Sequence, residues 1–415
     1  MLDKNTIIGF SLILALLVGW AYFLKPSDEE IEAYKRQQDS TNIAAIQQDS
    51  LVRTNIDSAK NNAIISASTD TASAIQAFGT FALAAQGTEE FSTIENNDLK
   101  VTFTNKGGRI YKVQLKKYKT YTQQDLVLFD GADNVQSFDF PTVDNKIINT
   151  ANLYFKPTIS DDKKSISMKV SIGENQYIEQ LYGFDSISNM LKYNINLVGL
   201  ENVIQRNRTS LDINWSTNLR MQEKTRDAEE RVSTIFYRVK DDEPSKLSEG
   251  SDAKETITSD LQWVSFKQQY FNQTIIAEKG FTDAVLETKN DPYKTYLRKF
   301  SSILTIPYDH KSNESFAMKI YYGPNHYKTL ETLNISLERI VTLGWGVFRW
   351  VNKYIVINVF DFLSRYIGSF GIIILMLTLL IKTALLPLVY KSYLSAAKMR
   401  LLKPEMDEIK EKTGG

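Results

Sequence analysis

The sequence has no cysteine and only two histidines among its 415 residues. The absence of cysteine excludes disulfides, thiolate catalysis, cysteine-based metal sites and lipid attachment through a cysteine. His310 and His326 stand in sequence contexts without metal-ligand spacing. We therefore expect both to be solvated loop residues, and we expect the protein to bind no metal and no cofactor.

Net charge is also lacking, because 49 Lys and Arg are balanced by 49 Asp and Glu. The broad basic field typical of nucleic-acid binding is absent, so we expect no nucleic-acid partner. The sequence contains no P-loop, dinucleotide-binding glycine fingerprint, nucleophile elbow or zinc-binding helix motif. These absences disfavour most enzyme classes, and we predict that the protein is not an enzyme.

One apolar stretch near the C-terminal end contains a single lysine. Residues 366–381 and 383–390 carry no charge, which is long enough to cross the hydrocarbon core of a bilayer. Lys382 lies about eight residues, or roughly 12 Å along a helix, from Tyr390. An ammonium at that depth costs about 2.5–3.5 kcal/mol. Lys382 is thus predicted to face a partner or a water-filled cavity, and escape to the interface by tilt or bilayer thinning is the alternative.

A second charge-free stretch, Thr6–Leu24, predicts an N-terminal transmembrane helix. A cleaved signal peptide is the alternative, but no convincing small-residue cleavage site follows the stretch. Orientation is predicted from the basic residues after the second stretch, which mark the cytoplasmic side. Both ends of the chain are then cytoplasmic and the region between them lies outside. These basic residues are Lys391, Lys398, Arg400 and Lys403.

Residues 26–88 are rich in Gln, Asn, Ser, Asp and Ala, a composition that predicts a flexible linker. Beyond them, apolar residues recur with a period of two, and Leu99–Thr104 and Arg109–Leu115 flank a turn with two glycines, as in a β-hairpin. About 240 residues of this kind predict a large antiparallel β-sandwich. Further strand candidates are Ser165–Ile172, Tyr177–Tyr182, Met190–Val198, Ser210–Trp215, Thr274–Ala277, Ser302–Ile306 and Ser315–Tyr322.

Helical periodicity appears after residue 343. Apolar side chains such as Phe348 and Phe362 fall on one side of the projection, and charged ones such as Lys353 and Asp361 fall on the other. Together with the tryptophans Trp345 and Trp350, this pattern is typical of a helix in the membrane interface. A helix docked on the β domain is the alternative. After residue 390, we expect a charged helix that is interrupted at Pro404 and needs a partner to bury its apolar stripe.

Three groups of motifs resemble the YidC family of membrane protein insertases. The first runs from Leu343-Gly-Trp-Gly through Gly371-IIILMLTLLI-Lys382-TALLPL to Tyr393-LSAAKMRLLK-Pro404. The others are Trp263-VSFKQQY-Phe271 and Tyr322-Gly-Pro-Asn325, which are similar to segments of that family's large periplasmic domain. The resemblance implies an inner-membrane protein with a β-supersandwich periplasmic domain and a membrane core that contains a hydrophilic groove.

In that family, a positive residue in the groove is thought to receive the polar segment of a client, and Lys382 occupies the matching position. Trp345, Trp350 and Pro387 are implied to be structural or interface residues. The implied partners are nascent membrane proteins and membrane lipids, together with the Sec translocon and the ribosome. Arginine is the commoner residue at the position of Lys382, and lysine, unlike arginine, loses its proton readily when desolvated. We also expect this chain to be the N-terminal part of a longer protein, with only the first core helix.

The predicted chain has six parts. They are an anchor at 1–25, a linker at 26–88, a periplasmic β-sandwich at 89–335, an interfacial helix at 336–366, a core transmembrane helix at 367–390 and the start of a cytoplasmic helical region at 391–415.

Two other functions remain as alternatives. One is a membrane-tethered periplasmic module that binds a peptide or a sugar, and the other is a hydrolase in which Lys382 would activate Ser392 or Ser395.

Overall fold

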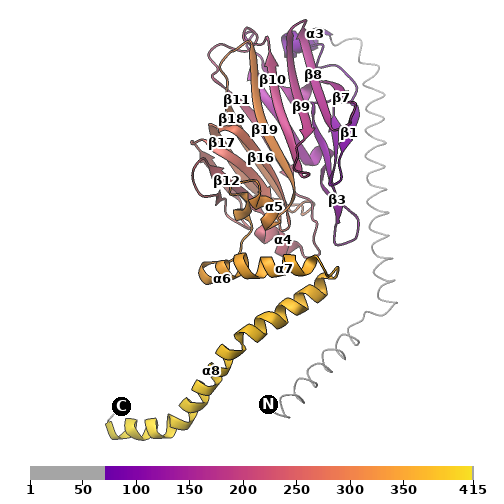
Figure 1. The fold of residues 1–415 in the computed structure, drawn as a ribbon. Coiled ribbons are helices and arrows are strands. Elements are labelled where there is room, and N and C mark those ends of the chain that lie inside the picture. The colour runs from indigo at the N-terminus through magenta and orange to yellow at the C-terminus, as the bar shows by residue number, and fades with distance from the viewer. Residues whose placement is uncertain (1–70, 414–415) are drawn as a thin grey trace. The chain divides into compact units, whose positions relative to one another are not determined.

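The computed structural model describes residues 71–413 (Figure 1). The predicted N-terminal transmembrane helix and most of the predicted linker lie outside the described residues. The chain divides into two compact units, residues 1–86 and 87–415. In the described part of the first unit, helix α3 (Thr71–Phe78) and the 3-10 turn η1 (Gly79–Phe81) stand where the linker was expected to continue. The alanines in this part of the sequence favour a helix.

Three antiparallel sheets build the second unit. One contains four strands in the order β1-β2-β3-β4, another nine in the order β13-β12-β15-β16-β19-β10-β9-β8-β7, and the third six in the order β14-β17-β18-β11-β5-β6. The strands are β1 (Phe91–Glu95), β2 (Leu99–Thr104), β3 (Arg109–Lys119), β4 (Asp125–Asp130), β5 (Asn134–Pro141), β6 (Ile147–Asn149), β7 (Lys156–Ile159), β8 (Ser165–Gly173), β9 (Gln176–Phe184), β10 (Met190–Val198), β11 (Ser210–Asn218), β12 (Thr234–Val239), β13 (Ser245–Lys246), β14 (Ala253–Ile257), β15 (Leu261–Lys267), β16 (Phe271–Phe281), β17 (Asp283–Asn290), β18 (Arg298–Pro307) and β19 (Asn313–Pro324).

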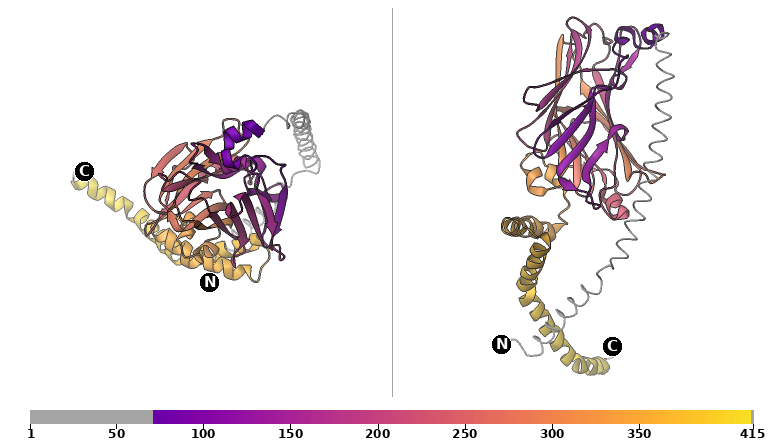
Figure 2. Two further views of the ribbon diagram at one scale, coloured as in Figure 1. Left: turned by 90° about the horizontal axis from the view of Figure 1, so that it is seen from above. Right: turned by 90° about the vertical axis from the view of Figure 1, so that its right-hand side faces the viewer.

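The nine-stranded and six-stranded sheets face each other across an apolar core, as two views of the ribbon show (Figure 2). Trp215 of β11 stacks on Phe266 of β15 with 3.9 Å between the ring centroids. Phe300 of β18 meets the same phenylalanine edge-on at 5.6 Å. Because these aromatic contacts join strands of different sheets, they fix the distance between the two layers. The predicted antiparallel sandwich is confirmed.

Strands with one covered face match the sequence prediction closely. β10 begins and ends where predicted, and β2, β3, β8, β9, β11, β16, β18 and β19 contain the other predicted stretches. Among the strands that the prediction missed are β12 and β15, in which four of six and six of seven residues are buried. Both lie in the nine-stranded sheet with other elements packed on each side. A strand that is covered on both faces has no polar side chain at alternate positions, so the period of two disappears.

The C-terminal part of the unit is helical. Helix α4 (Arg226–Val232) interrupts the strands, and the elements after β19 are α5 (Tyr327–Glu331), the 3-10 turn η4 (Leu337–Ile340), α6 (Gly346–Val351), the π-helical turn η5 (Asn352–Val356), α7 (Ile357–Ser364) and α8 (Phe370–Thr413). Helix α8 continues through the predicted boundary at residue 390 and through Pro404. The predicted interruption is therefore wrong. Proline costs a helix one backbone hydrogen bond, and strong helix formers on both sides compensate for that loss.

Helices α5 and η4 are attached to the β-sandwich by an apolar cluster. Leu330, Leu337 and Ile340 are fully buried, and they pack with residues of the nine-stranded sheet that include Trp263 and Tyr321. Burial of a side chain of this size stabilises the fold by about 1.5–3 kcal/mol. The Trp263 indole N–H also donates to the carbonyl of Ile335 at 2.9 Å. The segment that leads toward α6 is thus held against the sheet by both packing and a buried hydrogen bond.

The two motifs of the β domain that carry the family resemblance interlock. The Asn325 side chain donates to the carbonyl oxygens of Gln268 and Gln269, at 2.9 and 3.1 Å, in the turn between β15 and β16. Its own amide oxygen accepts a hydrogen bond from Asn272 at 2.9 Å. Gly323 is required in the same motif, because an added Cβ would lie 2.6 Å from the Tyr321 hydroxyl. These contacts connect β19 to the β15–β16 hairpin just before α5 begins.

A carboxyl group is buried beside that hairpin. Glu229 of α4 is 1% exposed, and it accepts the backbone N–H groups of Gln222 and Glu223 at 3.1 and 3.2 Å. The Gln268 amide donates to it at 3.4 Å. Burial raises the pKa of Glu229 to about 7, although the backbone donors oppose the shift. The folded domain therefore binds a proton here at a pH at which the unfolded chain has released it.

We expect the free energy of unfolding to fall as the pH rises from about 5 to about 8. The unfolded Glu229 has a pKa near 4.5, so the stabilisation from its raised folded pKa is complete below that value and is lost as the pH passes about 7. The effect is of the order of 1–3 kcal/mol. Denaturant titrations of the Glu229→Gln variant should lack this slope. Glu230→Gln, which removes the partner of Arg226 at 3.2 Å, is the control and should keep it; an unchanged slope in Glu229→Gln would contradict the prediction.

Candidate functional site at the membrane

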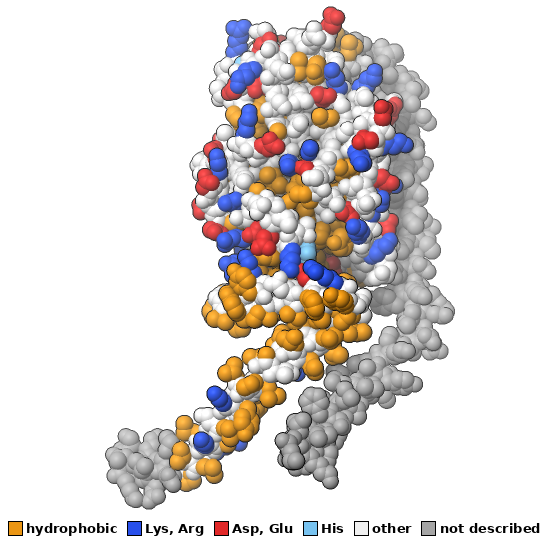
Figure 3. Space-filling view, in the orientation of Figure 1, with side chains coloured by type: hydrophobic (Ala, Val, Ile, Leu, Met, Phe, Trp, Pro, Cys, Tyr) orange, Lys and Arg blue, Asp and Glu red, His pale blue; other side chains and the backbone are white. Residues whose placement is uncertain are grey.

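Helix α8 has the dimensions of a membrane span. Residues 370–404 form a continuous helical stretch of 35 residues, whose most apolar window of 18 residues has a mean hydropathy of 2.5 and is only 6% buried. Its leucine and isoleucine side chains point outward over most of its length. Figure 3 shows these hydrophobic side chains along α8 and along α6 and α7, whereas charges of both signs are scattered over the β domain. By length and composition this helix is able to cross a bilayer.

Lys382 lies in the middle of that helix. It is twelve positions after Phe370, or roughly 18 Å along the axis, which is close to the centre of a core about 30 Å thick. The side chain is exposed, and among the described residues it forms no ion pair. The hydroxyls of Thr378 and Thr383, by contrast, donate to the carbonyls of Ile374 and Leu379 at 2.8 and 2.9 Å. Lys382 is therefore the one side chain of the span's centre that needs a polar partner from elsewhere.

Pro387 adds a second polar group at nearly the same level. Proline has no backbone N–H, so the carbonyl four residues earlier, that of Thr383, loses its usual helical donor. A free carbonyl in hydrocarbon is costly and is tolerated where protein or water supplies a donor. The predicted site residues Lys382 and Pro387 thus add a cation and a carbonyl without its usual helical donor to the same stretch of α8. Both features require a polar environment at the depth of the span.

Helices α6 and α7 present aromatic side chains to the solvent. Trp345 and Trp350 are 80% and 57% exposed, and Phe348 and Phe362 are 64% and 57% exposed. Trp345 meets Phe348 edge-on with 6.0 Å between their ring centroids, and Trp350 lies 5.6 Å from Tyr354. Large aromatic groups in such numbers are not normally left in water. Such exposure of aromatic side chains on one helix is typical of elements that lie in the headgroup region of a membrane, and the interfacial position of this helix stays a prediction.

Helix α7 lies beside α5 at the end of the β-sandwich (Figure 1), and polar side chains form the contacts between them. The Lys328 ammonium lies 2.7 Å from the Asp361 carboxylate, and the Lys353 ammonium lies 3.4 Å from that of Glu331. Lys353 also lies over the Tyr327 ring, 5.4 Å from its centroid. A hydrogen bond with Tyr327 raises the pKa of Lys353, which keeps this contact charged. The helix is thus docked on the β domain, as the alternative prediction had it, through its polar side, while its aromatic side stays exposed.

A stacked pair of rings links α7 to α8. Phe360 of α7 and Phe370 at the start of α8 lie parallel, with 6.1 Å between their centroids. The chain reverses direction between them over a short turn, in which Ile367 donates its backbone N–H to the carbonyl of Leu363 at 2.9 Å. The α6–α7 segment is therefore connected to the sandwich at one side and to α8 at the other. Trp345 and Trp350 lie on the α6–α7 segment, and Lys382 and Pro387 lie on α8.

Comparison with known proteins decides the family. The YidC periplasmic domain model matches residues 92–357, and the 60Kd inner membrane protein model matches residues 362–415. The chain belongs to the YidC family. A membrane protein insertase YidC of Parabacteroides distasonis is 36% identical over 100% of this chain and 67% of its own length. One of Bacteroides fragilis is 35% identical over 99% of this chain and 66% of its own length.

The chain thus spans about two thirds of the length of these YidC relatives. Insertases of this family make and break no covalent bond. Membership of the family therefore confirms the prediction that the protein is not an enzyme. A galactose mutarotase related enzyme from Lactobacillus acidophilus has a TM-score of 0.38 at 11% identity, over 56% of this chain and 97% of its own. That likeness is too distant to indicate any sugar chemistry in the YidC family member.

The ion pairs between α5 and α7 were not predicted from the sequence. Lys328 and Glu331 lie in a short helix whose strand-rich surroundings gave no helical signal, and Asp361 was assigned only to a polar face. The partner of each charge depends on how two separate helices are placed. Only the i to i+3 spacing of Lys328 and Glu331, which puts both charges on one side of α5, could have suggested a charged contact surface.

The ion pairs predict selective crosslinking between α5 and α7. The sequence has no cysteine, so a Lys328→Cys, Asp361→Cys pair introduces the only thiols. A short bismaleimide should join these two positions, and mass spectrometry of a digest should identify the joined peptides. In the control pair, Asp361→Cys is replaced by Phe362→Cys, which lies one position farther on the exposed apolar face. Equal crosslinking of both pairs would contradict the docking of the polar face.

Proposed function

We propose that this protein inserts and folds integral proteins of the inner membrane. The observation that carries the proposal is the position of Lys382, a cation without a partner among the described residues at the centre of a membrane span, in a chain of the YidC family. Relatives with this family's sequence are named membrane protein insertases. In this proposal, α8 contributes one wall of a hydrophilic groove. The remaining walls come from other transmembrane helices of the native protein.

Lys382 would lower the electrostatic cost of drawing an anionic segment into the bilayer. In a partly hydrated groove with an effective dielectric constant near 20, two opposite charges 4 Å apart attract by about 4 kcal/mol. This attraction offsets part of the cost of bringing a client's acidic residues away from bulk water. The free carbonyl beside Pro387 would accept a hydrogen bond from the client backbone or from water. The client's apolar helix then partitions into lipid, and no covalent bond changes.

Helices α6 and α7 would hold the periplasmic domain at the membrane surface. Their aromatic side enters the headgroup region, and their polar side is fixed to α5 by the two ion pairs. The proposed topology places the β domain in the periplasm and residues 391–415 in the cytoplasm. Nascent membrane proteins and lipids are the partners that this arrangement accounts for. Contacts with the Sec translocon and the ribosome remain predictions from the family resemblance.

Reversing the charge of Lys382 should impair insertion selectively. In cells that depend on the native gene, Lys382→Glu should reduce insertion of clients with acidic translocated tails by about fivefold or more, corresponding to ~1 kcal/mol of lost attraction. Insertion is measured by protease protection of the translocated tail. Lys382→Arg is the matched control and should retain function, because it keeps the charge. Clients with uncharged tails should be affected less, and equal insertion of acidic tails by Lys382→Glu would contradict the role of this residue.

Tryptophan fluorescence tests the interfacial helix. Brominated lipids quench tryptophans that lie in or near the bilayer. Trp215 and Trp263 are only 3% and 0% exposed in the β-sandwich, so we expect Trp345 and Trp350 to account for much of the quenched signal of a reconstituted protein. The double variant Trp345→Phe, Trp350→Phe should lose that share of the quenching. If the quenched fraction were unchanged, these residues would not lie in the lipid interface.

A further inference from the structure

The β-sandwich contains a cleft at the place where β16 leaves β19, before the chain passes from the nine-stranded sheet to β17 of the six-stranded sheet. β16 pairs with β19 from Phe271↔Pro324 to Ala277↔Met318, and its later residues turn away. The N–H of Thr282, just after β16, donates to the carbonyl of Thr305 in β18, which belongs to the six-stranded sheet. Residues 313–317 of β19 consequently have β10 on one side and no strand on the other. The cleft beside them has a volume of about 280 Å³.

The register shows which backbone groups face this cleft. The N–H of Gly199 donates to the carbonyl of Ser312 at 2.8 Å, and Val198 stands opposite Asn313. Directly opposed residues of an antiparallel pair exchange hydrogen bonds at every second position. The even-numbered residues of β19 therefore bond to β10, and the odd-numbered ones point to the other side. Asn313 and Ser315 direct their N–H and C=O groups into the cleft, where no strand among the described residues pairs with them. Ala317 adds its N–H, because its carbonyl belongs to the last step of the β16–β19 ladder, at the pair Ala277↔Met318.

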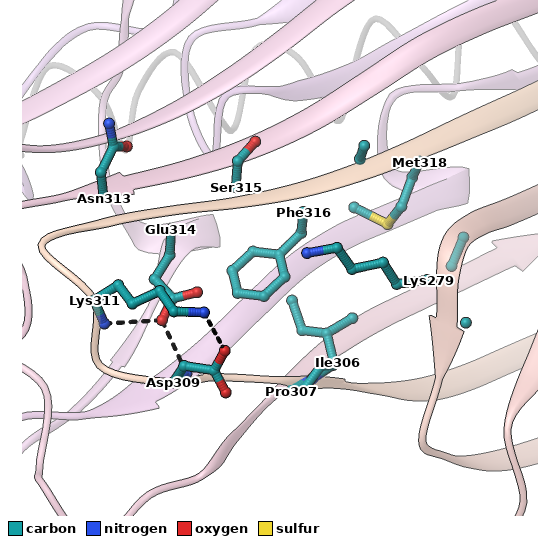
Figure 4. A pocket seen from close by; sticks show the side chains of 13 residues that line it. Lys279, Ile306, Pro307, Asp309, Lys311, Asn313, Glu314, Ser315, Phe316 and Met318 are labelled. Atoms are coloured by element: carbon teal, nitrogen blue, oxygen red, sulfur yellow. Dashed lines mark hydrogen bonds and ion pairs between the residues drawn. The ribbon is translucent and has the colours of Figure 1, made fainter.

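The floor of the cleft is apolar. Ile306, Phe316 and Met318 are 3%, 8% and 2% exposed, and their side chains point toward one another between the two sheets (Figure 4). In an added strand, alternate side chains would face this floor and the others would face solvent. The cleft therefore suits a chain in which every second side chain is apolar.

The charged groups around the cleft leave one cation available. The Asp309 carboxylate pairs with Lys311 at 2.6 Å, and Glu314 accepts the backbone N–H groups of Asp309 and Lys311, both at 2.9 Å. Both acidic groups are thus occupied. Lys279 reaches across toward Phe316 (Figure 4) and forms no ion pair with the described residues. An occupant with an acidic side chain beside Lys279 would complete the site.

We propose that this cleft binds an extended polypeptide segment as an additional strand on the free edge of β19. The segment alternates apolar side chains, which face Ile306, Phe316 and Met318, with polar ones, of which an acidic side chain contacts Lys279. Asn313 and Ser315, together with the N–H of Ala317, supply up to about five backbone hydrogen bonds. Translocated segments of clients are polypeptides of this kind while they are unfolded. The inference goes beyond the proposed insertion activity, and it is tested by binding alone.

The test uses the complete chain in lipid nanodiscs and a fluorescein-labelled heptapeptide that alternates valine with aspartate. Fluorescence anisotropy should show saturable binding. Ser315→Pro removes the one N–H at the centre of the free edge without removing a bond to β10, and it should weaken binding roughly tenfold. Ser315→Ala keeps that N–H and is the matched control. Melting temperatures verify that both variants are folded.

Two further measurements do not depend on the folding of the proline variant. The same peptide with N-methyl groups on alternate residues should not bind the unaltered protein, because it has lost the backbone donors on one edge. Lys279→Glu should weaken binding of the valine–aspartate peptide and strengthen that of a valine–lysine peptide. Equal affinity for the N-methylated peptide, or for Ser315→Pro and Ser315→Ala, would overturn strand addition. Concentration-dependent dimerisation abolished by Ser315→Pro, without peptide binding, would assign the edge to a second copy instead.

Discussion

The burial of Leu330, Leu337 and Ile340 against the nine-stranded sheet is the interaction on which the membrane-facing part of the structure depends. These side chains fix α5 and η4, and α5 in turn carries Lys328 and Glu331, the charges that hold α6 and α7. If this packing were loosened, the ion pairs could not hold α5 in place, because partly exposed ion pairs contribute little stability by themselves. Hydrophobic packing therefore sets the position of α5, and the ion pairs select which face of the α6–α7 segment turns toward α5.

The membrane span follows a different rule from the β domain. In the sandwich, buried polar groups such as Glu229 and Asn325 obtain hydrogen bonds from the backbone of neighbouring strands. In the described part of the membrane region, the threonines satisfy themselves within the helix, whereas Lys382 does not. A group that its own helix cannot satisfy requires another helix, water or a client. This requirement gives the family resemblance a physical meaning, because a groove is the environment in which an unpaired cation is both tolerated and useful.

The sequence predicted the elements whose pattern is local and missed those that depend on the whole fold. β10 and the β2–β3 hairpin could be predicted because one face is covered and the other is wet. β12 and β15 could not, because both of their faces are buried. That Lys382 lies within a long helix could be predicted, because the apolar residues on both sides of it form a local pattern. The pairing of Lys353 with Glu331 could not, because it requires the placement of α5 against the interfacial helix, and that placement is determined by the packing of distant strands.

The free edge of β19 both promotes aggregation and offers a surface for binding, and both properties follow from the order of the strands. β16 leaves β19 after Ala277, and the chain joins the six-stranded sheet only after β16 has ended, so the backbone groups of Asn313 and Ser315 have no partner strand on that side among the described residues. Exposed edges of this kind favour aggregation, and proteins normally protect them with charge. Lys279 and Lys311 lie at this edge, but Lys311 is already paired with Asp309. A single free lysine above an apolar floor discourages pairing with a basic or neutral strand more than with an acidic one. The same side chain that protects the edge would therefore also select its partner.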